Sequence, residues 1–169
     1  VSHLLEQGYR NIGYISGPLD WWEAQERKRG WCETLKSAGF NTSEQHCAEG
    51  NWSSSSGEQA FIQLLESFPD MDAVFVANDQ MALSVLREAC RRGIKIPEQL
   101  AVIGFDNIPE SAYFYPSLTT ISQDLQLLGG QAIQNIVEMI QARQENQPLI
   151  ARSLLIQPTL IIRESSKRV

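Results

Sequence analysis

The sequence of 169 residues has few of the features that mark secreted, membrane-bound or metal-binding chains. Its three cysteines, Cys32, Cys47 and Cys90, are an odd number at unrelated spacings, which argues against a disulfide framework and against a metal site. No apolar run approaches the ~18 residues that a membrane-spanning helix needs, and the first residues are not basic and signal-like. We therefore expect a cytoplasmic domain with no metal and no membrane partner.

Positive charge is also scarce. The 14 Lys and Arg are outnumbered by 20 Asp and Glu, which gives a net charge of −6. Binding to duplex DNA needs clustered cations that displace counterions from the phosphates, so any contact with DNA is expected to come from another part of the protein.

Sequence motifs of the common enzyme classes are missing as well. The chain contains no G-x-S-x-G elbow, no H-E-x-x-H pair, no P-loop and no dinucleotide fingerprint. His3 and His46 are far apart in the sequence, and neither is near a candidate nucleophile. The sequence predicts a protein that is not an enzyme, with no catalytic residues and no cofactor.

The chain does have a large apolar fraction in an ordered pattern. Hydrophobic residues make up 43% of it, enough for a substantial core. Short apolar runs alternate with helical patterns, which predicts an α/β fold with a doubly wound parallel sheet and right-handed crossovers. The expected strands are Ile12–Ser16, Gln45–Glu49, Ala73–Ala77, Leu100–Phe105, Leu118–Ser122, Ser153–Gln157 and Thr159–Ile162. The expected helices are Glu23–Ala38, Gly57–Ser67, Asp79–Arg92 and Asp124–Ala142, after a short one near Val1–Leu5 that Gly8 ends.

Polar side chains follow several of these strands directly. Asn78 and Asp79 come after the third strand, Asp106 after the fourth and Gln123 after the fifth. Ligands of open α/β sheets bind at the carboxyl ends of the strands, so the sequence predicts one small-molecule cleft there. We expect Asp79 to cap the following helix and Asn78 to face the ligand.

Several short motifs occur in the order found in one known family. They are Gly17-Pro18-Leu19, Gly30-Trp31, Gly50-Asn51-Trp52-Ser53, Asn78 to Leu83, Leu118 to Ile121, Gln123-Asp124 and Leu127-Leu128-Gly129. From Val1 to about Ser165 the chain resembles the effector-binding domain of the lac repressor family. The resemblance implies a type I periplasmic-binding-protein-like fold, in which two subdomains hold a sugar or purine between them.

The same resemblance implies how the chain is divided. Residues 1–122 would form chiefly the C-terminal, effector-binding subdomain, and residues 123–157 would add a crossover helix and a strand of the N-terminal subdomain. Residues 158–169 would be a return strand and tail. Most of the N-terminal subdomain and the DNA-binding headpiece would lie outside this chain, which is then expected to be a fragment.

Five residues fall on effector-binding positions of that family: Arg27, Trp52, Asn78, Asp106 and Gln123. From the residues alone, a surface pair with Glu23 is the favoured role of Arg27. Trp52 fits a plug in the core equally well, and Asp106 could serve only to stabilise its turn. The resemblance favours ligand binding, with guanidinium and carboxylate holding hydroxyls and the indole stacking on the sugar. Trp31 and Phe105 are expected in the core.

The chain departs from the family pattern near the expected mouth of the cleft. Trp21 and Trp22 replace small residues, Glu23 stands where a small hydroxyl residue is expected, and Leu125 replaces an aromatic one. We expect Trp22, Glu23 and Leu125 to line the cleft and to alter which ligand fits.

The resulting prediction is the sugar-binding part of a bacterial transcriptional repressor, with a galactoside-like effector. Operator DNA would be bound through the headpiece outside this chain. A homodimer is expected, with Pro109, Tyr113, Phe114 and Tyr115 at the interface. The alternatives are an extracytoplasmic sugar receptor of a transport system, which a signal peptide would favour, and a sugar-phosphate enzyme, which would need a Gly-rich loop or a basic cleft.

Overall fold

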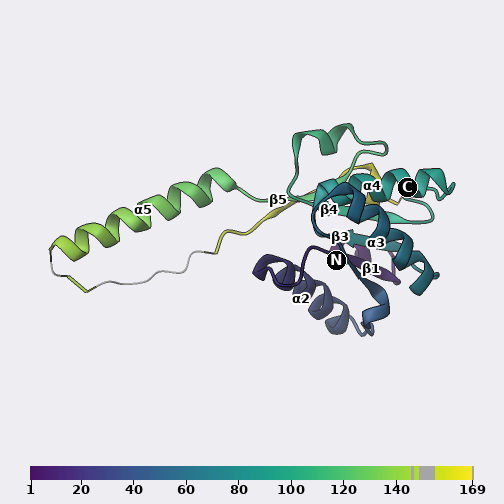
Figure 1. Cartoon of the computed structure of the whole chain (residues 1–169), viewed down its shortest axis with the longest axis horizontal. Coiled ribbons are helices and arrows are strands. Elements are labelled where there is room, and N and C mark those ends of the chain that lie inside the picture. Colours follow the sequence, from purple (N-terminus) through teal and green to yellow (C-terminus); the bar gives the residue numbers. More distant parts are fainter. Residues whose placement is uncertain (146, 149–154, 169) are drawn as a thin grey trace. The chain divides into compact units, whose positions relative to one another are not determined.

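A computed structural model describes residues 1–145, 147–148 and 155–168, and its backbone is drawn in Figure 1. The chain forms two compact units, Val1–Ile121 with Leu160–Val169, and Ser122–Thr159. Six strands form one sheet in the order β2-β1-β3-β4-β5-β6. The strands are β1 (Ile12–Ser16), β2 (Cys47–Glu49), β3 (Ala73–Val76), β4 (Ala101–Phe105), β5 (Thr119–Ser122) and β6 (Thr159–Ile161).

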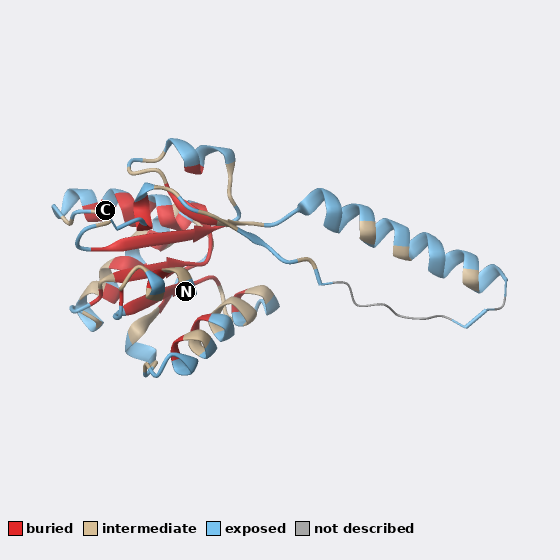
Figure 2. Ribbon diagram, turned by 180° about the vertical axis from the view of Figure 1, so that it is seen from behind, coloured by how far each residue is buried: buried red, intermediate tan, exposed pale blue. Residues whose placement is uncertain are grey.

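The first five strands pair in parallel, as the α/β alternation predicts. β1 pairs with β2 on one side and with β3 on the other, and β3–β4 and β4–β5 continue the ladder. The central strands are buried along their whole length (Figure 2), which explains why they read as continuous apolar runs. The chain reverses direction across the sheet after β2, so the carboxyl ends of β1 and β3 flank the switch point where α/β proteins bind ligands.

The described residues include five α-helices. They are α1 (Ser2–Glu6), α2 (Trp22–Ser37), α3 (Ser54–Ser67), α4 (Asp79–Arg91) and α5 (Leu125–Gln144). None of the described helices has the length and hydrophobicity that a membrane span requires. Helices α3 and α4 pack closely against each other: a methyl group added to Gly57 on α3 would lie 2.7 Å from the Cα atom of Met81 on α4. Small residues at this crossing therefore bring the two backbones together.

The core includes both aromatic residues that we expected to find there. Trp31 is 1% exposed, and its indole N–H donates to the Ile12 carbonyl at 3.1 Å, while Phe105 is 8% exposed. Tyr14 stacks on Trp31, and burial raises the pKa of its hydroxyl. Both residues that the sequence pattern assigned to the core are therefore buried.

The structure corrects several expected boundaries. Helix α3 begins at Ser54 instead of Gly57, because the Ser53 hydroxyl accepts from the Ser56 N–H and caps it there. A 3₁₀ turn over Glu44–His46 shortens β2. Of the strand expected over Ser153–Gln157, residues 153 and 154 lie outside the described residues, and residues 155–157 are not in a strand. The strand expected from Thr159 is confirmed as β6, ending at Ile161.

The end of the chain is packed into the first unit, which the sequence pattern did not predict. Ser165 and Ser166 are fully buried. The Ser165 hydroxyl donates to the Val102 carbonyl at 2.6 Å and accepts from the Thr119 N–H at 2.8 Å. Two serines carry no hydrophobic signal, so their burial is visible only once these hydrogen bonds are known.

Candidate effector site

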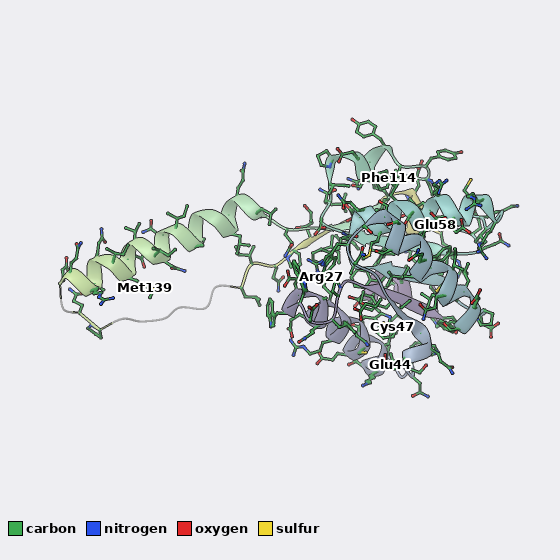
Figure 3. The ribbon with its side chains drawn as sticks, in the orientation of Figure 1. Arg27, Glu44, Cys47, Glu58, Phe114 and Met139 are labelled. Atoms are coloured by element: carbon green, nitrogen blue, oxygen red, sulfur yellow. The ribbon has the colours of Figure 1, made fainter. Side chains whose placement is uncertain are left out.

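Four loops at the carboxyl ends of neighbouring strands supply the candidate site in the first unit. Gly17 follows β1, Trp52 follows β2, Asn78 follows β3 and Asp106 follows β4. Arg27 comes from α2, and Figure 3 labels its side chain. We refer to Arg27, Trp52, Asn78 and Asp106 as the Arg27 cluster.

Arg27 is the centre of this cluster. Its Nη1 donates to the Ala77 carbonyl at 2.6 Å, and its Nη2 lies 3.9 Å from Asp106 Oδ1. The guanidinium also lies over the Phe105 ring, 3.8 Å from the centroid, a cation–π distance. Burial lowers its pKa and Asp106 acts in the opposite direction, while its side chain stays 16% exposed. Arg27 is therefore held at the strand ends by specific contacts, unlike a freely moving surface cation.

Asp106 has a strained backbone that its neighbours hold in place. Its φ is 107° and that of Asn107 is 52°, a region that non-glycine residues seldom occupy. Asp106 N–H donates to the Ile121 carbonyl at 2.9 Å, and Asn107 N–H donates to Thr120 Oγ1 at 3.3 Å. Strain of this kind persists where the surroundings impose it, and it is common at binding sites.

Electrostatics distinguish Asp106 from an ordinary surface carboxylate. Burial raises its pKa to about 6, with Arg27 opposing that rise and Asp79 adding to it. Its side chain nevertheless keeps 41% of its surface exposed. A carboxylate that is partly desolvated but accessible is suited to accept hydrogen bonds from ligand hydroxyls.

Trp52 packs against the backbone of the β1 loop. It has a φ of 72°, and a methyl group on Gly17 would lie 2.1 Å from its Cη2 and Cζ2 atoms. Arg27 lies 5.6 Å from the Trp52 ring centroid, and Trp21 meets the ring at 6.2 Å and 66°. Among the described residues, the buried Trp52 indole N–H has no hydrogen-bond partner. Trp52 is half-buried and packs against the edge of the core.

Asn78 takes the capping role that we expected of Asp79. Asn78, not Asp79, caps α4: its Oδ1 accepts from the Met81 N–H at 2.9 Å, and its Nδ2 donates to the Trp52 carbonyl at 3.0 Å. Asp79 is fully buried and accepts from Thr120 Oγ1 at 2.6 Å and from the Ile108 N–H at 2.9 Å. The expectation that Asp79 caps the helix was wrong. The reason is that Asp79 ties the loop after β4 to β5.

The remaining predicted contacts fall into two groups. Trp22 and Glu23 open α2, with Trp22 71% exposed and Glu23 half-buried. Gln123 and Leu125 belong to the second unit, at the start of α5. Their roles as ligand contacts stay predictions.

Three contributors escaped the sequence-based prediction. Gly17 lies under Trp52, Thr120 holds Asp79, and Arg163 donates to Asn107 Oδ1 at 2.9 Å. Gly17 was recognised only as part of a motif. Thr120 likewise was recognised only within the motif Leu118 to Ile121, and Arg163 carries no local signal, because it reaches the site from a segment remote in the sequence.

The predicted interface segment is partly exposed. Pro109 begins a 3₁₀ helix that ends at Tyr113, and Tyr113 and Tyr115 are 88% and 94% exposed. Phe114, labelled in Figure 3, is instead partly buried and packs against the core. An apolar phenyl ring between two tyrosines gains more from burial than they do.

The Arg27 cluster combines cationic donors, a carboxylate acceptor and an aromatic ring. No group of three or more His, Cys, Asp or Glu suited to a metal ion occurs within the described ranges. The fold and this cluster define an α/β ligand-binding domain whose site suits a neutral polyhydroxylated molecule.

Comparison with known proteins identifies the family. The model of the periplasmic binding protein-like domain matches residues 1–166, and the chain belongs to this family. The lactose operon repressor of Klebsiella pneumoniae is 38% identical over 98% of this chain and 45% of its own length. The transcriptional repressor CytR of Escherichia coli (strain K12) is 36% identical over 99% of this chain and 48% of its own length.

Solved structures agree in both fold and family. The transcriptional regulator CelR in complex with cellobiose has a TM-score of 0.87 at 33% identity, covering 96% of this chain and 48% of that one. The lac repressor dimer bound to operator and the anti-inducer ONPF has a TM-score of 0.86 at 31% identity, covering 98% and 55%. The periplasmic-binding-protein-like fold is thereby confirmed. The chain spans about half the length of the curated relatives that it matches, and these relatives are transcriptional repressors and regulators rather than enzymes.

Proposed function

We propose that this chain is the sugar-binding part of a bacterial transcriptional repressor. The observation that carries the proposal is the geometry of Arg27, which is held by the Ala77 carbonyl and the Phe105 ring with its Nη2 3.9 Å from Asp106 Oδ1. A fixed guanidinium fork beside an accessible carboxylate offers both the donors and the acceptor that adjacent sugar hydroxyls require. The proposed effector is galactoside-like, and the relation to the lactose operon repressor supports this choice.

In the proposed complex, each residue of the Arg27 cluster has one task. Arg27 donates to two hydroxyl oxygens, and Asp106 accepts from hydroxyl hydrogens. Trp52 offers its ring to the apolar C–H face of the sugar. Asn78 has one amide hydrogen engaged with the Trp52 carbonyl, and its second is directed to the ligand. Gln123, which belongs to the second unit, is proposed as a further ligand contact.

Regulation requires that the effector bind one arrangement of the complete protein better than another. We propose that sugar binding shifts a homodimer between arrangements that differ in affinity for operator DNA, which is bound in the cytoplasm by a headpiece outside this chain. A solved lac repressor relative is a dimer bound to operator. The proposed dimer surface is Pro109, Tyr113 and Tyr115, with Phe114 packed beneath as support.

An extracytoplasmic sugar receptor is the alternative, favoured by the description of the family as periplasmic binding protein-like. The two proposals differ in what precedes Val1 in the gene. A helix-turn-helix segment would favour the repressor, whereas a signal peptide would favour the receptor.

The proposal is tested with Arg27→Ala, Asp106→Ala and Trp52→Ala in the intact protein that contains this chain. Thermal melts and operator-release titrations with lactose are run on each variant. The proposal expects Arg27→Ala and Asp106→Ala to fold, to bind operator, and to lose at least tenfold in sensitivity to sugar, since each charge-assisted bond contributes roughly 1.5–3 kcal/mol. Arg29→Ala is the matched control, because Arg29 is a second arginine on α2 and its side chain is 61% exposed. An unchanged sugar response in Arg27→Ala would refute the proposal.

A further inference from the structure

Helix α2 begins in an unusual way. Its N-cap position is occupied by Trp21, which makes no side-chain capping hydrogen bond. The other three long helices begin with capping side chains, namely Ser53 for α3, Asn78 for α4 and Asp124 for α5. Tryptophan is a poor N-cap, because it offers no oxygen to the free N–H groups of the first turn. A residue that is unfavourable for the start of its helix, and that gains no compensating hydrogen bond there, is expected to serve a purpose other than helix stability.

The Trp21 side chain is placed beside the proposed sugar site. Its ring meets Trp52 at a centroid distance of 6.2 Å and an interplanar angle of 66°, so the two rings form the walls of an aromatic corner. Trp21 keeps 51% of its surface exposed, although tryptophan is usually largely buried. Within the first unit, an apolar surface therefore continues past Trp52 toward the start of α2.

The backbone that carries Trp21 is held in a defined position. The Trp21 N–H donates to the Pro18 carbonyl at 3.1 Å, and the Trp21 carbonyl accepts from the Gln25 N–H at 3.1 Å. The Gln25 side chain closes the turn by donating to the Leu19 carbonyl at 2.7 Å. A ring that is carried on this backbone and packs against Trp52 loses less conformational freedom on binding than a free side chain, which suits it to selecting ligands.

We propose that Trp21 is a specificity residue that selects a disaccharide over a monosaccharide, with its indole stacking on the second pyranose ring. The inference rests on the proposed function, since the first ring is the sugar held by the Arg27 cluster. The two indole planes stand at 66° to each other, so each offers a separate face to one ring of a disaccharide. A monosaccharide whose only pyranose ring stacks on Trp52 would leave the Trp21 indole exposed to solvent.

The test compares paired probes by calorimetry on the intact protein: lactose with methyl β-galactoside, and cellobiose with methyl β-glucoside. Trp21→Ser removes the ring and restores an ordinary N-cap, so it should raise the melting temperature while it changes specificity. We expect the wild type to bind one disaccharide at least tenfold more tightly than its paired glycoside, about 1.4 kcal/mol. In Trp21→Ser this preference should fall below threefold, with unchanged affinity for the methyl glycoside.

Lys36→Ser is the control on the same helix, because Lys36 is exposed in the last turn of α2, at the end opposite to Trp21. It should leave the disaccharide preference unchanged. The inference is overturned if Trp21→Ser keeps the preference, or if it weakens both members of a pair equally, which would mean that Trp21 only supports Trp52. Failure of the proposed function has a different signature: Arg27→Ala would bind the methyl glycosides as the wild type does, or none of the four probes would bind the wild type.

Discussion

The contact between Gly17 and Trp52 gives the sharpest test of how the site is built. A methyl group added to Gly17 would lie 2.1 Å from Trp52 Cη2 and Cζ2 and 2.4 Å from its Cε2. Ordinary carbon–carbon contacts are 3.5–4.0 Å, so Gly17→Ala must displace the indole by more than about 1 Å. The substitution thus moves the proposed stacking surface without removing any residue of the Arg27 cluster.

The expected cost in stability is modest, and the expected cost in binding is larger. Overpacking costs roughly 1–3 kcal/mol. The low end applies at Gly17, because the clashing atoms belong to the outer edge of one ring that can turn. Sugar binding depends on the position of that ring, so we expect the affinity for lactose or cellobiose to fall at least tenfold, about 1.4 kcal/mol.

Gly30→Ala is the matched control. Gly30 lies inside α2, is exposed, and has no atom within 4 Å of an added methyl group. Replacing glycine with alanine in a helix interior stabilises the fold by roughly 0.8–1 kcal/mol. Urea unfolding and calorimetry on the intact protein should find Gly30→Ala more stable with normal affinity, and Gly17→Ala less stable with weakened binding. Normal sugar affinity in Gly17→Ala would refute the described role of Trp52.

Three further predictions follow from the contacts described. Sugar affinity should fall as the pH drops below about 6 and Asp106 gains a proton, since burial raises its pKa to about 6. Because the fold disfavours the ionised carboxylate, Asp106 lowers the stability as the pH rises from about 4 to about 6. Asp106→Asn should flatten this loss of stability, and an unchanged pH profile would contradict the prediction. Asp79→Ala leaves Thr120 Oγ1 and the Ile108 N–H without their acceptor, so urea unfolding should show a loss of about 3 kcal/mol; less than 1 kcal/mol would contradict it. The isolated chain should self-associate through the exposed apolar residues of α5, among them Ile133 and Ile136; light scattering that finds a monodisperse monomer at high concentration would contradict this.

The sequence was sufficient for most of the fold because buried parallel strands produce continuous apolar runs. Ala73–Val76 and Ala101–Phe105 appear almost as the pattern placed them. The pattern placed the start of β2 at Gln45, whereas the strand begins at Cys47, because the residues before it form a 3₁₀ turn. The buried tail was missed, since Ser165 and Ser166 are held by hydrogen bonds and have no apolar surface to signal burial.

The candidate site was predictable only in part, for a related reason. Asn78 and Asp106 each follow a strand directly, and this position predicts that they lie near a ligand, because the carboxyl ends of parallel strands meet at one edge of the sheet. This position in the sequence does not reveal which of the polar side chains forms hydrogen bonds with other parts of the protein. Asn78 takes the capping role and Asp79 the buried one because Thr120 and Ile108, distant in sequence, supply donors that only Asp79 reaches. Long-range hydrogen bonds of this kind leave no periodic pattern.

The most direct test of the central claim is a crystal structure of the intact protein with a bound sugar, either lactose or cellobiose, whichever binds more tightly. We predict that one pyranose ring lies against Trp52, with hydroxyl groups within hydrogen-bond distance of the Arg27 guanidinium and the Asp106 carboxylate. A sugar bound elsewhere, with Arg27 still engaged only by Ala77, Phe105 and Asp106, would contradict the assignment of this cluster as the effector site.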